Sequence, residues 1–326
     1  MEIKIEKYVN YIYEKSFDNN NIEIIACFKE KLYIISFNIE NKKINEKKYK
    51  IETELITLSI FQIELKKYIF FGYKGVYIFD NLFSKKNSNI KHKQIIKNPI
   101  IGGIIINKNI IAFTSNSIFP SGEDKIIFYN LNYKSIFKEI EGYSFIFSIN
   151  GLSIINTEKF GKNNKILLCA CKKYNLEQKN GILSINIELE NNSNNFYHYF
   201  YETKNFEVYC FCQILNVNNE NPINGDINNK ENIKIFSTDF FFVGGFDEDK
   251  GLGMIKLFKI KYNKIFKNTS IEYIEDIIIE ENDEFNGFEG PISCITQSNM
   301  FGNIIITCWD GNIYLCKPPN IDYFYH

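Results

Sequence analysis

Short apolar runs alternate with polar turns along the whole chain, and they come in pairs. In each pair a first apolar run is followed by a turn and then by a second run. The first runs are residues 22–28, 68–72, 110–113, 166–171, 240–243 and 304–308, and the second runs are residues 32–37, 76–79, 126–129, 182–187, 254–258 and 313–315. Apolar runs of this length bounded by turn residues are typical of buried strands. The pattern therefore predicts six β-hairpins.

Additional strands flank each predicted hairpin and complete units of four strands. The strands expected before the hairpins are residues 9–13, 55–60, 103–106, 152–155, 208–215 and 292–296. Those expected after them are residues 44–50, 91–96, 136–140, 196–201 and 270–279, which alternate polar and apolar residues as half-solvated outer strands do. A sixth outer strand must come from residues 1–7 or 321–326. We expect the N-terminal segment, because its pairing with the C-terminal unit would close a ring.

The spacing of the units predicts the fold class. The starts of successive first runs are separated by 46, 42, 56, 74 and 64 residues, and the shorter steps match the roughly 40–45 residues of a four-stranded propeller blade. We therefore predict an all-β protein, a single β-propeller over residues 1–326 with six visible blades. Seven blades are possible if the longest step contains an irregular one. The Asn-rich residues 216–232 are predicted to be a flexible insertion.

Composition excludes several classes of partner. The formal net charge is −1, and all 38 basic residues are lysine. Without a guanidinium group the chain lacks the usual donor for bidentate recognition of guanine or phosphate, so we expect no sequence-specific nucleic-acid binding. The N-terminus is charged and no apolar stretch reaches about 20 residues, so we expect neither a signal peptide nor membrane insertion. The abundant Asn, Lys and Ile suggest an AT-rich protist genome.

Cysteine usage indicates a compartment. The chain has 8 cysteines and no recognisable secretory signal, which is typical of reduced thiols in a cytoplasmic or nuclear protein. Cys169 and Cys171, and likewise Cys210 and Cys212, could each present two thiolates on one face of a strand. Structural zinc sites, however, usually use turn-borne C-x₂₋₄-C pairs. We therefore interpret both pairs as core residues and expect no bound metal.

Other short motifs of the chain do not carry recognisable chemistry. Residues 247–251 weakly resemble a calcium loop but lack the later bidentate Glu, so an acidic turn explains them better. The Gly pairs at 102–103 and 244–245 fit strand positions where neighbouring elements crowd the backbone. The chain contains no G-x-S-x-G, H-E-x-x-H or P-loop motif. We therefore predict no enzymatic activity, no catalytic residues and no cofactor.

Residues 292–295 and 303–315 resemble the inner strand, hairpin and third strand of a WD-repeat blade. The Trp-Asp pair that usually closes the third strand is replaced by Phe79-Asp80 and Tyr129-Asn130 in two other units, whereas Trp309-Asp310 falls in a hairpin turn. The family's Gly-His pair is absent. The resemblance covers nearly the whole chain in a degenerate form, and it implies a WD40-like propeller.

This resemblance implies a non-catalytic protein-interaction scaffold, a propeller subunit of a larger eukaryotic complex. Its partners would be other proteins, and we do not expect an obligate homo-oligomer. One alternative is an open propeller completed by a blade that a partner donates, as in coat and nuclear-pore scaffolds. A third possibility is a propeller enzyme or small-ligand binder that uses the central channel.

The longest turns predict where partners bind. Turns between second and third strands lie at one end of a ring, and the long ones span residues 115–124, 172–180 and 246–252. Exposed apolar groups on such turns are typical of anchors that a partner buries. The alternative is that these side chains fold back over the channel. The candidate partner-binding residues are Phe119, Pro120, Tyr174, Leu176, Phe246, Asp247, Trp309 and Asp310.

Overall fold

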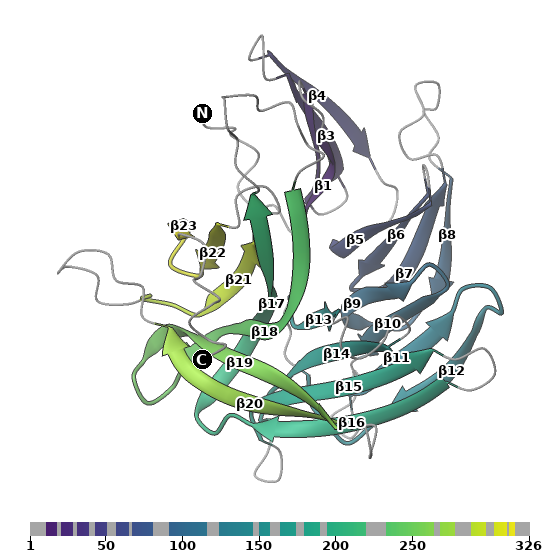
Figure 1. Cartoon of the computed structure of the whole chain (residues 1–326). Coiled ribbons are helices and arrows are strands. Elements are labelled where there is room, and N and C mark those ends of the chain that lie inside the picture. Colours follow the sequence, from purple (N-terminus) through teal and green to yellow (C-terminus); the bar gives the residue numbers. More distant parts are fainter. Residues whose placement is uncertain are drawn as a thin grey trace. The chain divides into compact units, whose positions relative to one another are not determined.

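The computed structural model is made of antiparallel sheets (Figure 1). It describes residues 11–17, 21–28, 31–38, 43–50, 57–64, 67–80, 91–115, 124–145, 150–156, 164–173, 179–189, 194–219, 233–263, 268–277, 288–297, 303–311 and 313–316. These residues contain strands and turns and no helix. Correspondingly, no helix in this part of the chain is long and apolar enough to span a membrane. The chain divides into two compact units, Met1–Gly142 and Tyr143–His326.

The first unit contains three four-stranded sheets. Their strand orders are β1-β2-β3-β4, β5-β6-β7-β8 and β12-β11-β10-β9, so every strand pairs with its neighbour in sequence. The strands are β1 (Tyr11–Phe17), β2 (Asn21–Phe28), β3 (Lys31–Asn38), β4 (Lys43–Lys50), β5 (Thr57–Glu64), β6 (Lys67–Gly72), β7 (Gly75–Asp80), β8 (Lys91–Ile96), β9 (Ile100–Asn107), β10 (Ile110–Ser115), β11 (Lys125–Asn130) and β12 (Ser135–Ile140).

The second unit contains two four-stranded sheets and one three-stranded sheet. Their orders are β13-β14-β15-β16, β17-β18-β19-β20 and β21-β22-β23. The strands are β13 (Leu152–Ile155), β14 (Asn164–Cys171), β15 (Gly181–Leu189), β16 (Asn194–Glu202), β17 (Phe206–Asn219), β18 (Ile233–Asp247), β19 (Leu252–Asn263), β20 (Asn268–Ile277), β21 (Ile292–Gln297), β22 (Ile304–Cys308) and β23 (Ile313–Cys316).

The predicted hairpins are confirmed. All twelve apolar runs lie in strands, and each first run pairs in antiparallel register with its second run, as β6 does with β7. The eleven flanking strands are also present, although residues 9–10, 55–56 and 278–279 of the predicted ranges lie outside the described residues. Four-stranded antiparallel sheets whose strands follow sequence order are the blade unit of β-propellers. The chain is therefore all-β and built from propeller-type blades.

The predicted number of complete blades is wrong for the residues that the structure describes. Five sheets there have four strands, and the sixth, β21–β23, has three. The missing outer strand was expected from an end of the chain, and residues 1–10 and 317–326 lie outside the described residues. Its source therefore remains a prediction, and no seventh sheet is present in the described part.

The Asn-rich insertion begins later than predicted. Strands β17 and β18 stay paired beyond their apolar parts, through Val217 with Ile235 and Asn219 with Ile233. Residues 216–219 therefore belong to a strand, because backbone pairing satisfies their amide and carbonyl groups whatever the side chain. Residues 220–232, the rest of the predicted loop, lie outside the described residues.

Two buried clusters form the core of the second unit. One joins β13–β16 to β17–β20 and includes Phe206, Val208, Phe241 and Phe258. The other joins β17–β20 to β21–β23 and includes Cys210, Phe240 and Ile292. Strand β17 contributes to both clusters because alternate residues of a strand point to opposite faces of the sheet.

The strand glycines lie where side chains crowd the backbone, as the sequence predicted. A Cβ atom on Gly103 of β9 would lie 2.0 Å from the Phe71 ring of β6. A Cβ atom on Gly244 of β18 would lie 2.6 Å from both Cys210 and Ile292. Neither position has room for a larger residue, so packing between adjacent strands and sheets requires glycine here.

Candidate functional site

Strand ends from several sheets of the second unit meet in one region. Strand β17 begins at Phe206, which pairs with Asp247 at the end of β18. Lys172, just after β14, forms an ion pair with Glu207 of β17. Trp309, just after β22, contacts Tyr209 of β17. We call this region the strand-end face of the second unit.

Asp247 organises the turn between β18 and β19. Its Oδ1 accepts a hydrogen bond from the backbone N–H of Lys250 at 3.1 Å, and its carbonyl oxygen accepts one from Gly251 at 2.8 Å. Gly251 has φ +67°, a left-handed conformation that glycine adopts without strain. Asp247 is 8% exposed, so its carboxylate is mainly a structural part of the turn.

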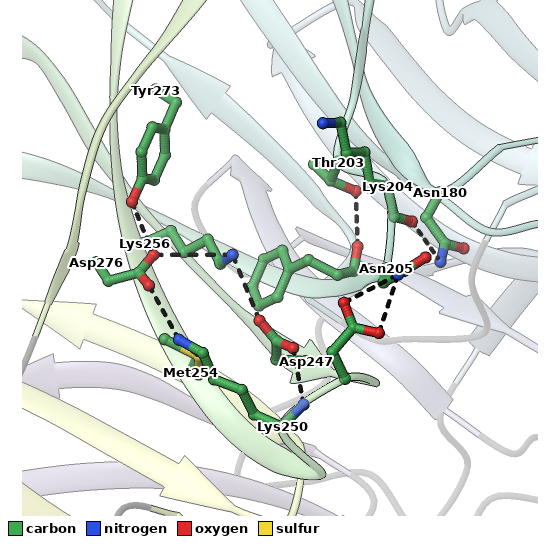
Figure 2. A network of polar contacts seen from close by, with 12 residues as sticks. Asn180, Thr203, Lys204, Asn205, Asp247, Lys250, Met254, Lys256, Tyr273 and Asp276 are labelled. Atoms are coloured by element: carbon green, nitrogen blue, oxygen red, sulfur yellow. Dashed lines mark hydrogen bonds and ion pairs between the residues drawn. The ribbon is translucent and has the colours of Figure 1, made fainter.

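Lys256 of β19 lies at the centre of the polar network that Figure 2 shows. Its Nζ is 3.7 Å from Asp247 Oδ2 and 3.7 Å from Asp276 Oδ1. The same ammonium group lies 4.4 Å from the centre of the Phe206 ring. A partly buried lysine needs such partners, because removing its charge from water is costly.

The outer edge of this network reaches β20 (Figure 2). The Tyr273 hydroxyl donates to Asp276 Oδ1 at 2.9 Å, and Lys250 Nζ lies 3.4 Å from Asp276 Oδ2. Burial, followed by the hydrogen bond to Asp276, raises the pKa of Tyr273 to about 12. The contacts of Asp276 thus connect the β18–β19 turn to the outer strand.

Hydrogen bonds also join this turn to the one between β16 and β17. Asn205 donates its side-chain N–H to both oxygens of Asp249, at 3.0 and 2.9 Å, and its carbonyl oxygen accepts from Glu248 N at 2.9 Å. Asn180 donates to the Lys204 carbonyl at 3.2 Å. The turns of the β13–β16 and β17–β20 sheets are therefore held together in a defined geometry.

Trp309 is the only tryptophan of the chain, and its side chain is 62% exposed. Its backbone N–H donates to the Pro291 carbonyl at 3.0 Å, and this hydrogen bond holds the backbone of Trp309 in place. Its ring lies edge-to-face with that of Tyr209, with centroids 5.3 Å apart. The indole therefore packs against the Tyr209 ring on one side, while the rest of it faces solvent.

Charged groups surround the buried Tyr209. Its hydroxyl donates to Glu207 Oε2 at 2.8 Å, and Glu207 Oε1 lies 2.8 Å from Lys172 Nζ. Burial raises the pKa of Tyr209, and the hydrogen bond to Glu207 and the charges of Glu207 and Glu248 raise it further. The phenol therefore stays protonated at neutral pH and acts as a hydrogen-bond donor.

The structure describes four of the eight predicted partner-binding residues. Trp309 is exposed, as an anchor requires, whereas Asp310 is half-buried and accepts a hydrogen bond from the Tyr314 hydroxyl at 3.1 Å. Phe246 is half-buried and packs on the core, and Asp247 is buried in its own turn. The other four, Phe119, Pro120, Tyr174 and Leu176, lie outside the described residues.

The cysteine pairs lie in strands, and all four residues are buried. Burial raises the pKa of Cys169, Cys210 and Cys212, that of Cys212 to about 12. Protonated thiols are poor metal ligands. In the part of the chain that the structure describes, no group of three or more His, Cys, Asp or Glu side chains is placed to hold a metal ion.

Sequence reasoning missed the residues that support Trp309 and Asp247. Tyr209, Glu207, Lys172 and Lys256 are far from Trp309 in sequence, and their proximity depends on how sheets pack. One usable signal was present: Glu207 is the only charged residue in the otherwise mostly apolar run 206–212.

Comparisons with known proteins found similarity in structure and none in sequence. No family model and no curated protein sequence matches the chain. The chain is similar to the WD40 domain of SCAP from fission yeast, with 11% identity, TM-score 0.45, and coverage of 94% of this chain and 72% of that one. The β-propeller domain of the Trilobed protease from Pyrococcus furiosus shows 10% identity, TM-score 0.42, and 96% and 83% coverage. Kluyveromyces lactis Hsv2 shows 9% identity, TM-score 0.41, and 84% and 75% coverage. At these values we transfer no function from any of them.

Proposed function

We propose that the chain is a non-catalytic β-propeller that acts as a protein-interaction scaffold, a subunit of a larger complex. The observation that carries this proposal is the exposed Trp309 on the strand-end face. Tryptophan is among the residues most enriched in binding hot spots, and a 62% exposed ring leaves much apolar area in contact with water. A partner that covered this ring would remove that area from water.

The surroundings of Trp309 suit a preformed binding surface. Its backbone bond to Pro291 and its ring contact with Tyr209 restrict the side chain before any partner arrives. Restricting a side chain in advance lowers the entropy lost on binding. The hydrogen-bonded turns at Asn205 and Asp247 give the same rigidity to the neighbouring part of the face.

The proposal is tested by isolating the tagged full-length protein from its native cells with two variants. Trp309→Ser removes the proposed anchor. Tyr133→Ser is the matched control, because Tyr133 is an 82% exposed aromatic residue in a turn of the first unit. Quantitative mass spectrometry then compares the co-purified proteins, and melting temperatures confirm that both variants remain folded.

We expect at least one partner to be depleted several-fold with Trp309→Ser and retained with Tyr133→Ser. The reason is that truncating a hot-spot residue typically costs about 2 kcal/mol or more of binding free energy. Wild-type yields of every partner with folded Trp309→Ser protein would contradict the proposal that this ring is the docking point.

A second candidate is a propeller completed by a strand from a partner. It is favoured by the three-stranded sheet of the described part, in which Ile313 of the last strand is 74% exposed. A donated strand would pair along β23. Under this candidate Ile313→Lys, which places a charge on that strand, releases the partner while Trp309→Ser retains it.

A further inference from the structure

Strand β16 forms the outer edge of the first sheet of the second unit (Figure 1). No Lys, Asp or Glu occurs in this strand before its last residue, Glu202. Long aromatic strands without charge readily pair with other strands when they lie at the edge of a sheet. Six aromatic side chains follow one another along β16: Phe196, Tyr197, His198, Tyr199, Phe200 and Tyr201.

The outer strands of the other four-stranded sheets carry charges. Charged side chains on edge strands oppose pairing between molecules. Strand β16 therefore lacks a protection that the other four-stranded sheets have. The protecting residues are Lys43, Glu46, Lys47, Lys48 and Lys50 in β4, Lys91 and Lys93 in β8, Lys138 and Glu139 in β12, and Glu272, Glu275 and Asp276 in β20.

The backbone of β16 also presents hydrogen-bonding groups at this edge. The strand pairs with β15 in one unbroken register, and just beyond it Thr203 N donates to Asn180 O at 2.9 Å. Because hydrogen-bonded pairs alternate along an antiparallel ladder, Tyr199 directs its N–H and C=O groups toward β15, whereas His198 and Phe200 direct theirs away. No strand of the described sheets pairs with β16 on that side.

Contacts within the unit hold the aromatic rings of β16 in place. The Phe200 ring stacks on that of Tyr143, with centroids 5.6 Å apart. On the opposite face of the strand, Tyr201 meets Phe258 edge-to-face at 5.5 Å. His198 is exposed. Rings that are restricted before another strand arrives lose less entropy on pairing.

We propose that β16 pairs in antiparallel orientation with β16 of a second copy of this chain, about a two-fold axis at His198. This register places Phe196 of each copy opposite Phe200 of the other, and aromatic cross-strand pairs are favourable. It places Glu202 opposite Asn194, so no like charges face each other. Because each copy already has its four-stranded sheet, the dimer is reversible and not obligate.

The absence of charge favours a second copy as the occupant of this edge. Two identical strands that carry several charges of one sign, as β4 does, repel each other when they pair. Residues 194–201 contain no Lys, Asp or Glu, so a copy of β16 meets no such repulsion along this length. A second copy also supplies the same aromatic spacing by identity, which a strand from another protein would have to match.

Sedimentation velocity of the purified full-length protein, from about 1 to about 100 μM, tests this pairing. We expect a monomer that converts to a dimer and to no larger species, because pairing about a two-fold axis uses the edge of both copies. A monomer throughout this range would overturn the proposal, and so would growth beyond the dimer. Trp309→Ser should dimerise like the wild type, so this test is independent of the docking role of that ring.

Two substitutions that introduce the same charge locate the interface. His198→Lys places two ammonium groups opposite each other at the axis, and we expect the Kd of the dimer to rise about five-fold. Ile136→Lys is the matched control on the outer strand β12, where Ile136 is 47% exposed, and it should leave Kd unchanged. Melting temperatures confirm that both variants remain folded. A wild-type Kd for His198→Lys would place the contact elsewhere and overturn the proposal.

A cysteine at the axis tests the register. The Cα atoms of a directly opposed hydrogen-bonded pair lie about 5.5 Å apart, which a disulfide can span. Oxidation with copper–phenanthroline should therefore join His198→Cys protein into a covalent dimer on a non-reducing gel. The wild type and Ile136→Cys should remain monomeric under the same conditions. Equal yields of covalent dimer from the two cysteine variants would contradict pairing at His198.

Discussion

The ammonium group of Lys256 lies 4.4 Å from the centre of the Phe206 ring. Phe206 is the first residue of β17 and pairs with Asp247, the last residue of β18, and Lys256 also approaches the carboxylate of Asp247. Through Phe206, Asp247 and Asp276, Lys256 therefore contacts the start of β17, the end of β18 and the last part of β20. We therefore expect the stability of the strand-end face to depend on this side chain.

Replacing this lysine tests the dependence. We expect Lys256→Met to lower the free energy of unfolding by about 2 kcal/mol, because it leaves the buried Asp247 carboxylate without its cationic partner. Lys261→Met is the matched control on the same strand. The ion pair of Lys261 with Glu272 is largely exposed, so its loss should cost about 0.5 kcal/mol or less. Denaturant unfolding measures both, and equal losses would contradict the central role of Lys256.

Alkaline pH should weaken the contact between Tyr273 and Asp276. The pKa of Tyr273 is raised from 10.0 to about 12, so the folded state favours the protonated phenol. Its contribution is complete below pH 10.0 and is lost as pH rises toward about 12. We expect Tyr273→Phe to show a smaller fall of the denaturation midpoint across this interval than the wild type. An identical fall in both proteins would show that this phenol does not contribute.

Gly103 in the first unit should not tolerate a side chain. A Cβ atom there would lie 2.0 Å from the buried Phe71 ring, so Gly103→Ala should destabilise the protein by about 2 kcal/mol through overpacking. Phe71→Leu provides space at the same contact. The double variant should therefore lose less stability than the sum of the two single variants, and simple additivity would place the strain elsewhere.

Thiol labelling should distinguish the buried cysteines. Cys169 and Cys210 are fully buried, and burial raises the pKa of both thiols, so few thiolates form at pH 8. We expect a maleimide to leave these two residues unmodified in the folded protein. During an incubation of equal length in denaturant, it should modify both. Peptide mapping by mass spectrometry locates the label. Rapid labelling of either residue in the folded state would contradict its burial.

The strands were predictable because their signals are local. Each apolar run, such as residues 304–308, is bounded by turn residues a few positions away, and it pairs with the run that follows. The position of Trp309 in a hairpin turn could be predicted for the same reason. The burial of Asp247 was harder to predict, because the sequence places this residue in an acidic turn but does not show that its carboxylate points inward.

The contact between Tyr209 and Trp309 could not be predicted from the sequence. These residues belong to different sheets, and no regular spacing relates them. They meet because β17 packs against β21, where Cys210 and Ile292 share one buried cluster. A register shift in β17 between Val208 and Cys210 also changes which face Tyr209 occupies. Such irregularities follow from packing, which the apolar pattern does not encode.

The strictly sequential pairing of the strands has an evolutionary consequence. In the described residues, each strand is hydrogen-bonded to strands next to it in sequence, so lengthening a turn requires no strand to find a new partner. Residues 220–232 illustrate this, since the flanking Asn219 and Ile233 remain paired across them. Turns can thus gain or lose residues while the sheets persist. The length and composition of the turns can therefore vary at little cost to folding.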